Sequence, residues 1–180
     1  MNKVIVIDNF FTSIDDFYML ASGEHYLTHT QFSKSMGYEE HPWPGRRTLP
    51  LHKTNPLIMQ MFNDHFGKKI APILNDDCFY KMYHYLHLRL QDDNDKDYPH
   101  YDAQDYTLLI YLSKTNLNSG TVLLDDNDNV IFDCKFVQNR AFLFSKNYKH
   151  MAVNNHGDSI ENGRLTMNVF IDKVRKNEGT

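Results

Sequence analysis

The chain has 180 residues, a formal net charge of −4 with neutral histidines, and 41% hydrophobic and 13% aromatic residues. This length favours one domain over residues 1–180, with a hydrophobic core that needs no metal or disulfide for stability. The acidic balance argues against general nucleic-acid binding, and no apolar run approaches the ~20 residues of a membrane span.

The two cysteines suggest a reducing environment. Cys78 and Cys134 are far apart and form no Cys-x-x-Cys pair, so we expect free thiols. The N-terminus reaches Asp8 too early for a secretory signal peptide. We therefore expect a cytoplasmic protein without a nucleic-acid or membrane partner. The sequence leaves the oligomeric state open, with a homodimer as one option.

The first part of the chain is predicted to contain a strand, two helices and a loop. A run of β-branched residues indicates the strand. Apolar residues recur at helical spacing after a Ser-x-x-Asp capping sequence and after Asn-Pro. Prolines at alternate positions forbid a helix in the segment between them. The predicted elements are a strand at 4–7, a helix at about 14–24, a surface loop at 33–53 and a helix from Asn55 to Gly67.

The rest of the chain is predicted to be mainly strands separated by Asn, Asp and Gly turns. Alternating or continuous apolar runs of five to ten or so residues favour strands over helices. We expect strands at 79–90, 106–112, 121–124, 130–137, 141–144 and 165–174, with an acidic loop at 91–97. Early helices followed by strands indicate an α+β, mainly β fold whose body is a sandwich or barrel.

One short segment carries the strongest chemical signal. In extended backbone the side chains of His100 and Asp102 point to the same side. An imidazole and a carboxylate directed at one point are two of the three ligands of the facial triad that holds non-haem Fe(II). A second His-x-Asp pair, His156 and Asp158, is followed by no further histidine. Only the first pair can therefore be followed along the chain by a third ligand.

Two later histidines compete for the third position. His150 follows a predicted apolar strand, so a rigid element can orient it. His156 lies in an Asn- and Gly-containing segment typical of an exposed turn. We favour His150 and leave His156 open. His84 and His87, on the predicted strand at 79–90, are expected to be core or cleft residues rather than ligands.

A cation follows these candidate ligands. Arg164 begins the last predicted strand, and Thr166 faces the same way. A guanidinium matches a carboxylate bidentately, and a hydroxyl can add a hydrogen bond to it. The alternative is a structural arginine held in an ion pair.

In this order the motifs resemble those of the 2-oxoglutarate/Fe(II)-dependent dioxygenases, particularly the prolyl-hydroxylase-like branch, which includes phage members. Each motif is short, but together they span most of the chain. The segments that carry the resemblance are Val4–Phe11, Tyr98–Asp102, Leu108–Leu112, Ser119–Thr121, Arg140–Phe144 and Gly157–Thr166.

The resemblance implies a double-stranded β-helix, or jelly roll, with N-terminal helices packed on one sheet. It implies His100, Asp102 and His150 as catalytic iron ligands, and Arg164 with Thr166 or Tyr85 as the residues that bind 2-oxoglutarate. The implied reaction hydroxylates a C–H bond while 2-oxoglutarate becomes succinate and CO2, with ascorbate as an auxiliary reductant. Animal prolyl hydroxylases have a lysine where this chain has Arg164, so the resemblance does not extend to proline as substrate.

The substrate class remains broad at this level: an amino acid, a peptide side chain or another small metabolite. Trp43, Arg46 and Arg47 are candidates to line the entrance and meet a carboxylate-bearing substrate, although an exposed loop would also explain them. Two other hypotheses for the whole chain are a non-catalytic jelly-roll binding domain and a cupin-like metalloprotein.

Overall fold

The computed structural model describes residues 3–37, 39, 43–74, 77–93 and 97–175. Its helices are α1 (Ile14–Ser22), α2 (His29–Met36), α3 (Leu51–Thr54), α4 (Pro56–Lys69) and α5 (Ala71–Leu74). Its strands are β1 (Val4–Ile7), β2 (Arg46–Arg47), β3 (Cys78–Arg89), β4 (Tyr106–Tyr111), β5 (Asn116–Leu124), β6 (Val130–Phe136), β7 (Ala141–Ser145), β8 (Lys149–Val153) and β9 (Arg164–Arg175). The fold is mainly β, as predicted.

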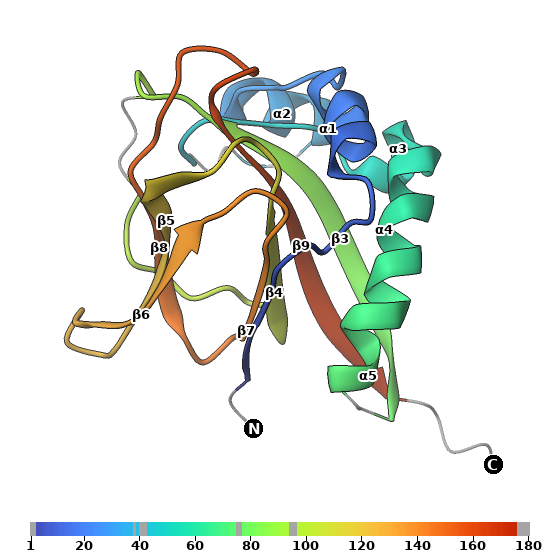
Figure 1. Ribbon diagram of the computed structural model, residues 1–180, viewed down its shortest axis with the longest axis vertical. Helices are drawn as coiled ribbons and strands as arrows, with labels where there is room; N and C mark the ends of the chain where they lie inside the picture. The colour runs from blue at the N-terminus through green and yellow to red at the C-terminus, as the bar shows by residue number, and fades with distance from the viewer. Residues whose placement is uncertain (1–2, 38, 40–42, 75–76, 94–96, 176–180) are drawn as a thin grey trace.

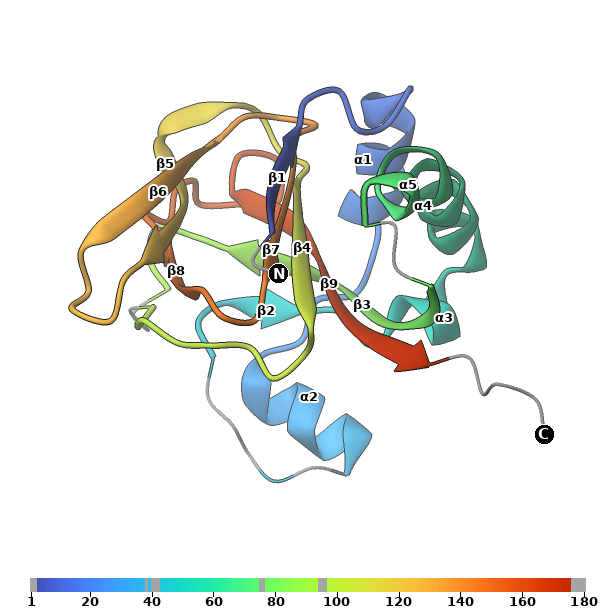
Figure 2. The same ribbon diagram turned by 90° about the horizontal axis from the view of Figure 1, so that it is seen from below.

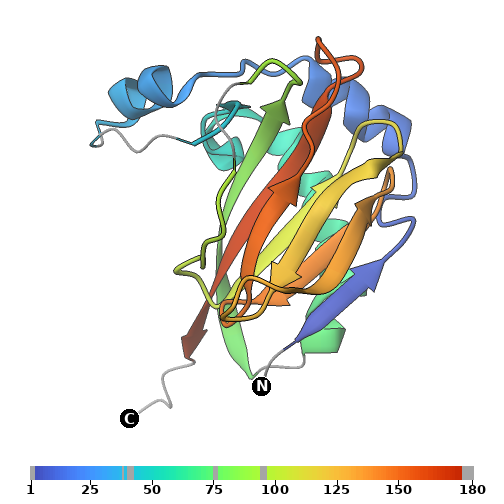
Figure 3. The ribbon, with the colours of Figure 1, turned by 90° about the vertical axis from the view of Figure 1, so that its left-hand side faces the viewer.

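The strands form two antiparallel sheets. The larger has the order β1-β7-β4-β9-β3-β2, and the smaller has the order β6-β5-β8. Helices α1, α3, α4 and α5 lie along one face of the larger sheet, while the smaller sheet lies on its other side (Figure 1). Helix α2 lies apart from the other helices, on the side of β2 (Figure 2). From the side of the smaller sheet, the long strands β3 and β9 are seen behind it (Figure 3).

Strand β9 contributes one face to the core beneath the helices and the other to the cavity between the sheets. It pairs with β3 from Cys78↔Arg175 to Arg89↔Arg164, and with β4 on its other edge. Its odd-numbered residues Leu165, Met167, Val169 and Ile171 are fully buried in the core beneath the helices. Its even-numbered residues Arg164, Thr166, Asn168 and Phe170 line a cavity between the sheets. The period of two in a strand thus separates a packing face from a polar face.

Two apolar clusters hold the layers together. The first joins the helices to the larger sheet and includes Phe17 of α1, Phe62 of α4 and Leu86 of β3. The second lies between the sheets, where Tyr111 stacks on Phe136 with ring centroids 4.5 Å apart. The second cluster fills one part of the space between the sheets, and the polar cavity occupies another.

Side-chain capping explains the start of α4 but not that of α1. The side chain of Asn55 accepts a hydrogen bond from the amide of Ile58 at 3.0 Å, and Pro56 is the first residue of α4. Ser13 is the N-cap residue of α1, but its side chain caps no amide, because its hydroxyl donates to Asp16 Oδ2 at 2.6 Å. The capping box predicted there is therefore wrong, although the helix is present.

The predicted surface loop at 33–53 is also wrong in part. Helix α2 extends into its beginning, α3 occupies its end, and β2 lies between them. The capping box of Thr28 and Gln31 and the left-handed Gly37 define α2, and both signals were present in the sequence. Residues 41 and 42, at the centre of the predicted loop, lie outside the described residues.

The end of one helix and the presence of one strand also differ from expectation. Gly67 does not end α4, which continues to Lys69, because Phe62 and Phe66 anchor this helix in the core and offset the glycine. Strand β8 was not predicted as a strand.

Both cysteines are free, as expected. None of the described helices combines the length and apolar character that crossing a membrane would require.

Candidate metal centre

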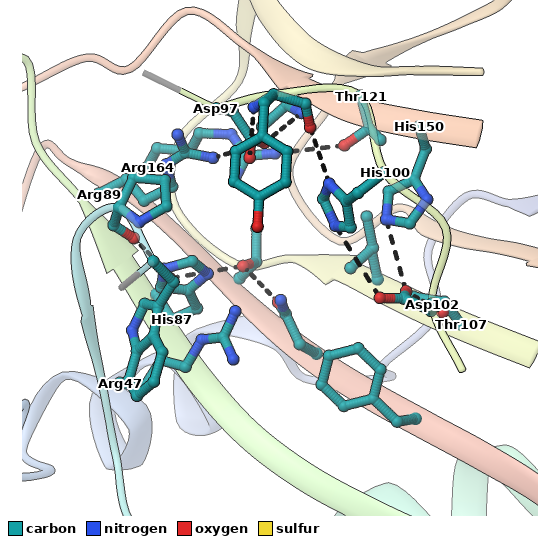
Figure 4. Close-up of a pocket in the computed structure, with 18 residues that line it drawn as sticks. Arg47, His87, Arg89, Asp97, His100, Asp102, Thr107, Thr121, His150 and Arg164 are labelled. Carbon is teal, nitrogen blue, oxygen red and sulfur yellow. Dashed lines mark hydrogen bonds and ion pairs between the residues drawn. The ribbon is translucent and has the colours of Figure 1, made fainter. Parts of the chain in front are cut away.

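Three of the predicted residues converge in the cavity between the sheets. His100, Asp102 and His150 each offer one ligand atom, and these atoms lie within 4.8 Å of one another. His150 Nε2 is 3.4 Å from Asp102 Oδ2, and His100 Nε2 is 3.9 Å from Asp102 Oδ1. The three lie together on one side of the pocket (Figure 4).

Backbone pairing sets the two imidazoles side by side. His100 and His150 form an antiparallel bridge, with N–H···O distances of 3.1 Å and 2.9 Å in the two directions. Their ring centroids are consequently 4.3 Å apart. His150 belongs to β8, which pairs with β5, so the sheet fixes its position. The extended segment then carries Asp102 to the same side as His100, as the sequence spacing predicted.

Hydrogen bonds orient each ligand. The Nδ1 atoms of His100 and His150 lie 2.8 Å and 3.5 Å from the carbonyl oxygens of Tyr98 and Tyr148. A ring whose Nδ1–H donates to a carbonyl keeps the lone pair on Nε2, the atom that faces Asp102. The Thr107 hydroxyl donates to Asp102 Oδ2 and holds the carboxylate.

The chemistry of this donor set fits a ferrous ion. Burial lowers the pKa of His150, and Asp102 opposes this effect only in part, so the ring is neutral at pH 7 and can act as a ligand. Two neutral imidazoles and one carboxylate form the set that holds non-haem Fe(II) and leaves positions for other ligands. The side chains of His150 and Asp102 are 8% and 14% exposed, and that of His100 is 33% exposed.

Arg164 lies in the same pocket, buried and held by the smaller sheet. Its Nη2 donates to the Gly120 carbonyl at 3.1 Å and to Thr121 Oγ1 at 3.2 Å, while its Nε is buried without a partner among the described residues. Burial lowers the pKa of Arg164 to about 10, which still leaves it charged at pH 7. Thr166, two residues later, also lines the pocket and donates to Asn168 Oδ1 at 2.7 Å.

A second buried cation, Arg89, is neutralised within the protein. Arg89 pairs with Asp97 at 3.0 Å, and Asp97 also accepts the amide of Ala152 in β8 at 2.6 Å. Burial alone would raise the pKa of Asp97, but Arg89 and this amide hold it below its ordinary value. The pair therefore ties the segment before His100 to both sheets.

The third arginine, Arg47, lies on the side of the pocket opposite the triad, together with His87 and the other two arginines (Figure 4). Its guanidinium carbon is 4.7 Å from the ring centroid of Trp43. Gly45 has φ +82°, and a Cβ there would lie 2.4 Å from the Leu88 carbonyl, so glycine allows this segment to cross β3 closely. The approach places the Pro44 carbonyl 2.6 Å from His87 Nε2.

The other predicted site residues lie elsewhere. Arg46 does not line the pocket, because strand alternation turns it away from the side of Arg47, and it pairs with Asp93 at 3.8 Å. Tyr85 is also outside the lining, since its ring packs between Phe32 and Phe170 at centroid distances of 5.9 Å and 6.2 Å. We therefore do not retain these two predicted roles.

His156, the alternative third ligand, is not part of the group of converging ligands found in the described residues. Its ring lies edge-on to Phe136 at 5.3 Å, and burial followed by the charge of Arg164 lowers its pKa.

Several pocket residues were not predicted as site residues. Thr107 and Arg89 are polar residues near the borders of predicted strands, which is the sequence signal that could have identified them, whereas Asp97 lies at the end of the predicted acidic loop and carried no such signal. His87, expected in the core or a cleft, is in the cleft. The full lining consists of Trp43, Pro44, Arg47, His87, Arg89, Asp97, Tyr98, His100, Asp102, Thr107, Leu109, Thr121, His150, Ala152, Arg164, Thr166, Asn168 and Phe170.

Neither protein-family models nor curated proteins yield a match to the sequence. Solved structures do match. An oxidoreductase of the 2OG-Fe(II) oxygenase family from Burkholderia pseudomallei is 11% identical, with a TM-score of 0.68 over 94% of this chain and 84% of that one. HygX from Streptomyces hygroscopicus, solved with nickel and 2-oxoglutarate, is 11% identical, with a TM-score of 0.65 over 95% and 83%.

A viral collagen prolyl hydroxylase from Paramecium Bursaria Chlorella virus-1, solved with 2OG, is 16% identical, with a TM-score of 0.61 over 96% of both chains. These identities are low, so the comparison establishes the fold and leaves the activity to the site itself. The chain has the fold of solved 2-oxoglutarate/Fe(II) oxygenases.

Proposed function

We propose that this protein is an Fe(II)- and 2-oxoglutarate-dependent dioxygenase that hydroxylates a C–H bond of an amino acid, a peptide side chain or a small metabolite. The observation that carries the proposal is the meeting of His100, Asp102 and His150 in one cavity with the buried Arg164. Iron ligands and an anchor for a dicarboxylate are the two parts that this reaction needs, and both face the same space.

In this proposal each side chain has a defined task. His100, Asp102 and His150 hold Fe(II), and Thr107 keeps the carboxylate of Asp102 oriented. Arg164 binds the distal carboxylate of 2-oxoglutarate through its Nε and its remaining N–H groups, with the hydroxyl of Thr166 beside it. Bound iron would supply the activation of dioxygen that couples decarboxylation of 2-oxoglutarate to oxidation of the substrate.

The protein supplies orientation and a shielded cavity. The cavity lies between two sheets, and apolar residues such as Leu109 and Phe170 form part of its wall. Arg89 and Asp97 join β3, β8 and the segment of His100, and so fix the positions of the two sides of the cavity relative to each other. His150 and Arg164 lie on strands and are less free to shift than residues on loops, and the bridge to His150 ties the segment of His100 to the same sheet.

The strand pairing supports a finer description of the fold. Along the chain, β3 and β4 belong to the larger sheet, β5 and β6 to the smaller, β7 to the larger, β8 to the smaller and β9 to the larger. The segment at His100, between β3 and β4, bridges to β8 of the smaller sheet. We propose that these strands form a double-stranded β-helix, since the chain passes between the sheets as that topology requires.

Anaerobic titration tests the function directly. Protein with Fe(II) and 2-oxoglutarate is expected to show a metal-to-ligand charge-transfer absorption, and His100→Ala is expected to abolish it. In air, with ascorbate present, succinate release is then screened over amino acids, peptides and small metabolites. A wild-type protein with no absorption and no succinate would refute the proposal. A binding domain would fail both measurements, whereas a cupin-like metalloprotein would bind metal without the keto acid.

A further inference from the structure

The charges in the pocket do not balance once the proposed cofactor and co-substrate are counted. Among the described lining residues, three arginines face two aspartates, so the lining carries one net positive charge when its histidines are neutral. Fe(II) would add two positive charges and 2-oxoglutarate two negative ones. One cation therefore remains unmatched, and a buried unmatched charge is costly.

The contacts of the arginines show which one is unmatched. Arg89 is paired with Asp97 at 3.0 Å. In the function proposed above, Arg164 binds the distal carboxylate of 2-oxoglutarate. Arg47 has no ion pair with any described carboxylate, and its buried Nε has no hydrogen-bond partner among the described residues. Burial lowers the pKa of Arg47 to about 10, so it remains charged at pH 7.

Trp43 adds a second unused donor at the same place. Its ring lies 4.7 Å from the Arg47 guanidinium carbon, and its Nε1 is buried without a described partner. Both side chains line the pocket. Two buried N–H donors without acceptors, one of them charged, are a match for an anionic oxygen pair.

The backbone holds Arg47 firmly. Its amide donates to the Leu27 carbonyl at 2.9 Å, its carbonyl accepts from the Leu27 amide at 2.8 Å, and β2 pairs with β3 at His87 on the other side. Because the backbone is held and the guanidinium lies over the Trp43 ring, the side chain loses little freedom when an anion binds, which favours specific recognition.

We propose that Arg47 and Trp43 bind a carboxylate of the molecule that is oxidised, so that the substrate is a small carboxylic acid or an acidic side chain. This inference rests on the proposed function, because Arg164 is thereby reserved for 2-oxoglutarate. Trp43 and Arg47 line the same pocket as the triad, so a carboxylate bound to them would lie in the space that the metal site faces. In Figure 4, Arg47 and the triad lie on opposite sides of the pocket, so a substrate held by its carboxylate can extend toward the metal site.

The test uses full-length protein with Fe(II) and saturating 2-oxoglutarate under anaerobic conditions. Butyrate and its uncharged isostere butyramide are titrated by saturation-transfer NMR, with propyl phosphate as a third probe. Wild-type protein is expected to bind butyrate about tenfold more tightly than butyramide, and more tightly than propyl phosphate. Arg47→Gln is expected to remove the preference for butyrate over butyramide.

The matched control is Arg46→Gln, which removes the neighbouring arginine that does not line the pocket, and it is expected to keep the wild-type preference. If Arg47→Gln does not fold, Arg47→Lys keeps the charge without the planar fork and is expected to reduce the preference. No preference in wild-type protein, an equal loss in Arg46→Gln, or tighter binding of propyl phosphate would overturn the proposal.

The charge-transfer absorption is recorded first in the same samples. Its absence from wild-type protein would refute the proposed function. A normal absorption with equal affinities for butyrate and butyramide would refute only the carboxylate assignment. Loss of 2-oxoglutarate binding in Arg47→Gln would also refute the carboxylate assignment, because it would show that Arg47 binds 2-oxoglutarate and not the substrate.

Discussion

The hydrogen bond from Thr107 to Asp102 gives a sharp test of the metal centre. Thr107 is 1% exposed at the start of β4, and its hydroxyl is a donor to the carboxylate oxygen that lies 3.4 Å from His150 Nε2. Thr107→Val keeps the β-branched shape and the strand while removing this donor. The carboxylate is then free to rotate away from the two imidazoles.

The expected loss follows from the strength of one charge-assisted hydrogen bond. Such a bond contributes about 1.5 to 3 kcal/mol, and changes in the residues that orient metal ligands weaken metal binding by about 10- to 100-fold. We expect Thr107→Val to weaken Mn(II) binding, measured by electron paramagnetic resonance, within this range. Mn(II) is used because it resists oxidation in air.

The control is Thr48→Val, another threonine that is 1% exposed and whose hydroxyl accepts the Leu86 amide at 3.0 Å, outside the pocket lining. This variant is expected to lose stability but not metal affinity. Thermal unfolding of both variants without metal separates the two effects. An unchanged Mn(II) dissociation constant in Thr107→Val, or an equal weakening in Thr48→Val, would refute the reasoning.

Three further predictions concern other residues. His150→Ala is expected to weaken Mn(II) binding by at least about 100-fold and His156→Ala to leave it unchanged; equal effects would contradict the assignment of the third ligand. Arg164→Met is expected to weaken 2-oxoglutarate binding about 100-fold in the charge-transfer titration, with Mn(II) affinity retained, since it removes charge-assisted hydrogen bonds. Burial, with a smaller effect of His52, lowers the pKa of His84 to about 4, so the unfolded chain binds a proton there first and stability falls as pH drops from about 6.5 toward 4. Between pH 7.5 and 5, urea unfolding of wild-type protein is expected to lose about 2 kcal/mol more than that of His84→Phe, and parallel curves would show that His84 does not titrate as described.

The sequence predicted those features that depend on local spacing. The alternation of a strand was enough to place His100 and Asp102 on one side, and the order of elements was enough to favour His150. The capping residues Asn55 and Pro56 located a helix start. Short apolar runs located most strands because their period and length exclude helices.

The rest depended on contacts between distant segments. Nothing in the immediate surroundings of Arg46 and Arg47 distinguishes them, and only the pairing of β2 with β3 and Leu27 directs Arg47 into the pocket. Tyr85 shares the parity of His87, yet Phe32 of α2, a helix that was not predicted, covers it. The role of Asp97 is visible only when β8 and β3 are brought together around it.

The alternation along β9 constrains how this chain can change. Even positions such as Arg164 and Thr166 face the cavity, and odd positions such as Leu165 and Met167 face the helices. Deletion of one residue within the strand would exchange the two sets, turning apolar side chains toward the cavity and polar ones into the hydrophobic core beneath the helices. Mutational drift in this strand should therefore proceed by substitution, with length held fixed. Libraries that vary Asn168 and Phe170 would change the lining of the cavity while leaving the buried odd positions of the core intact.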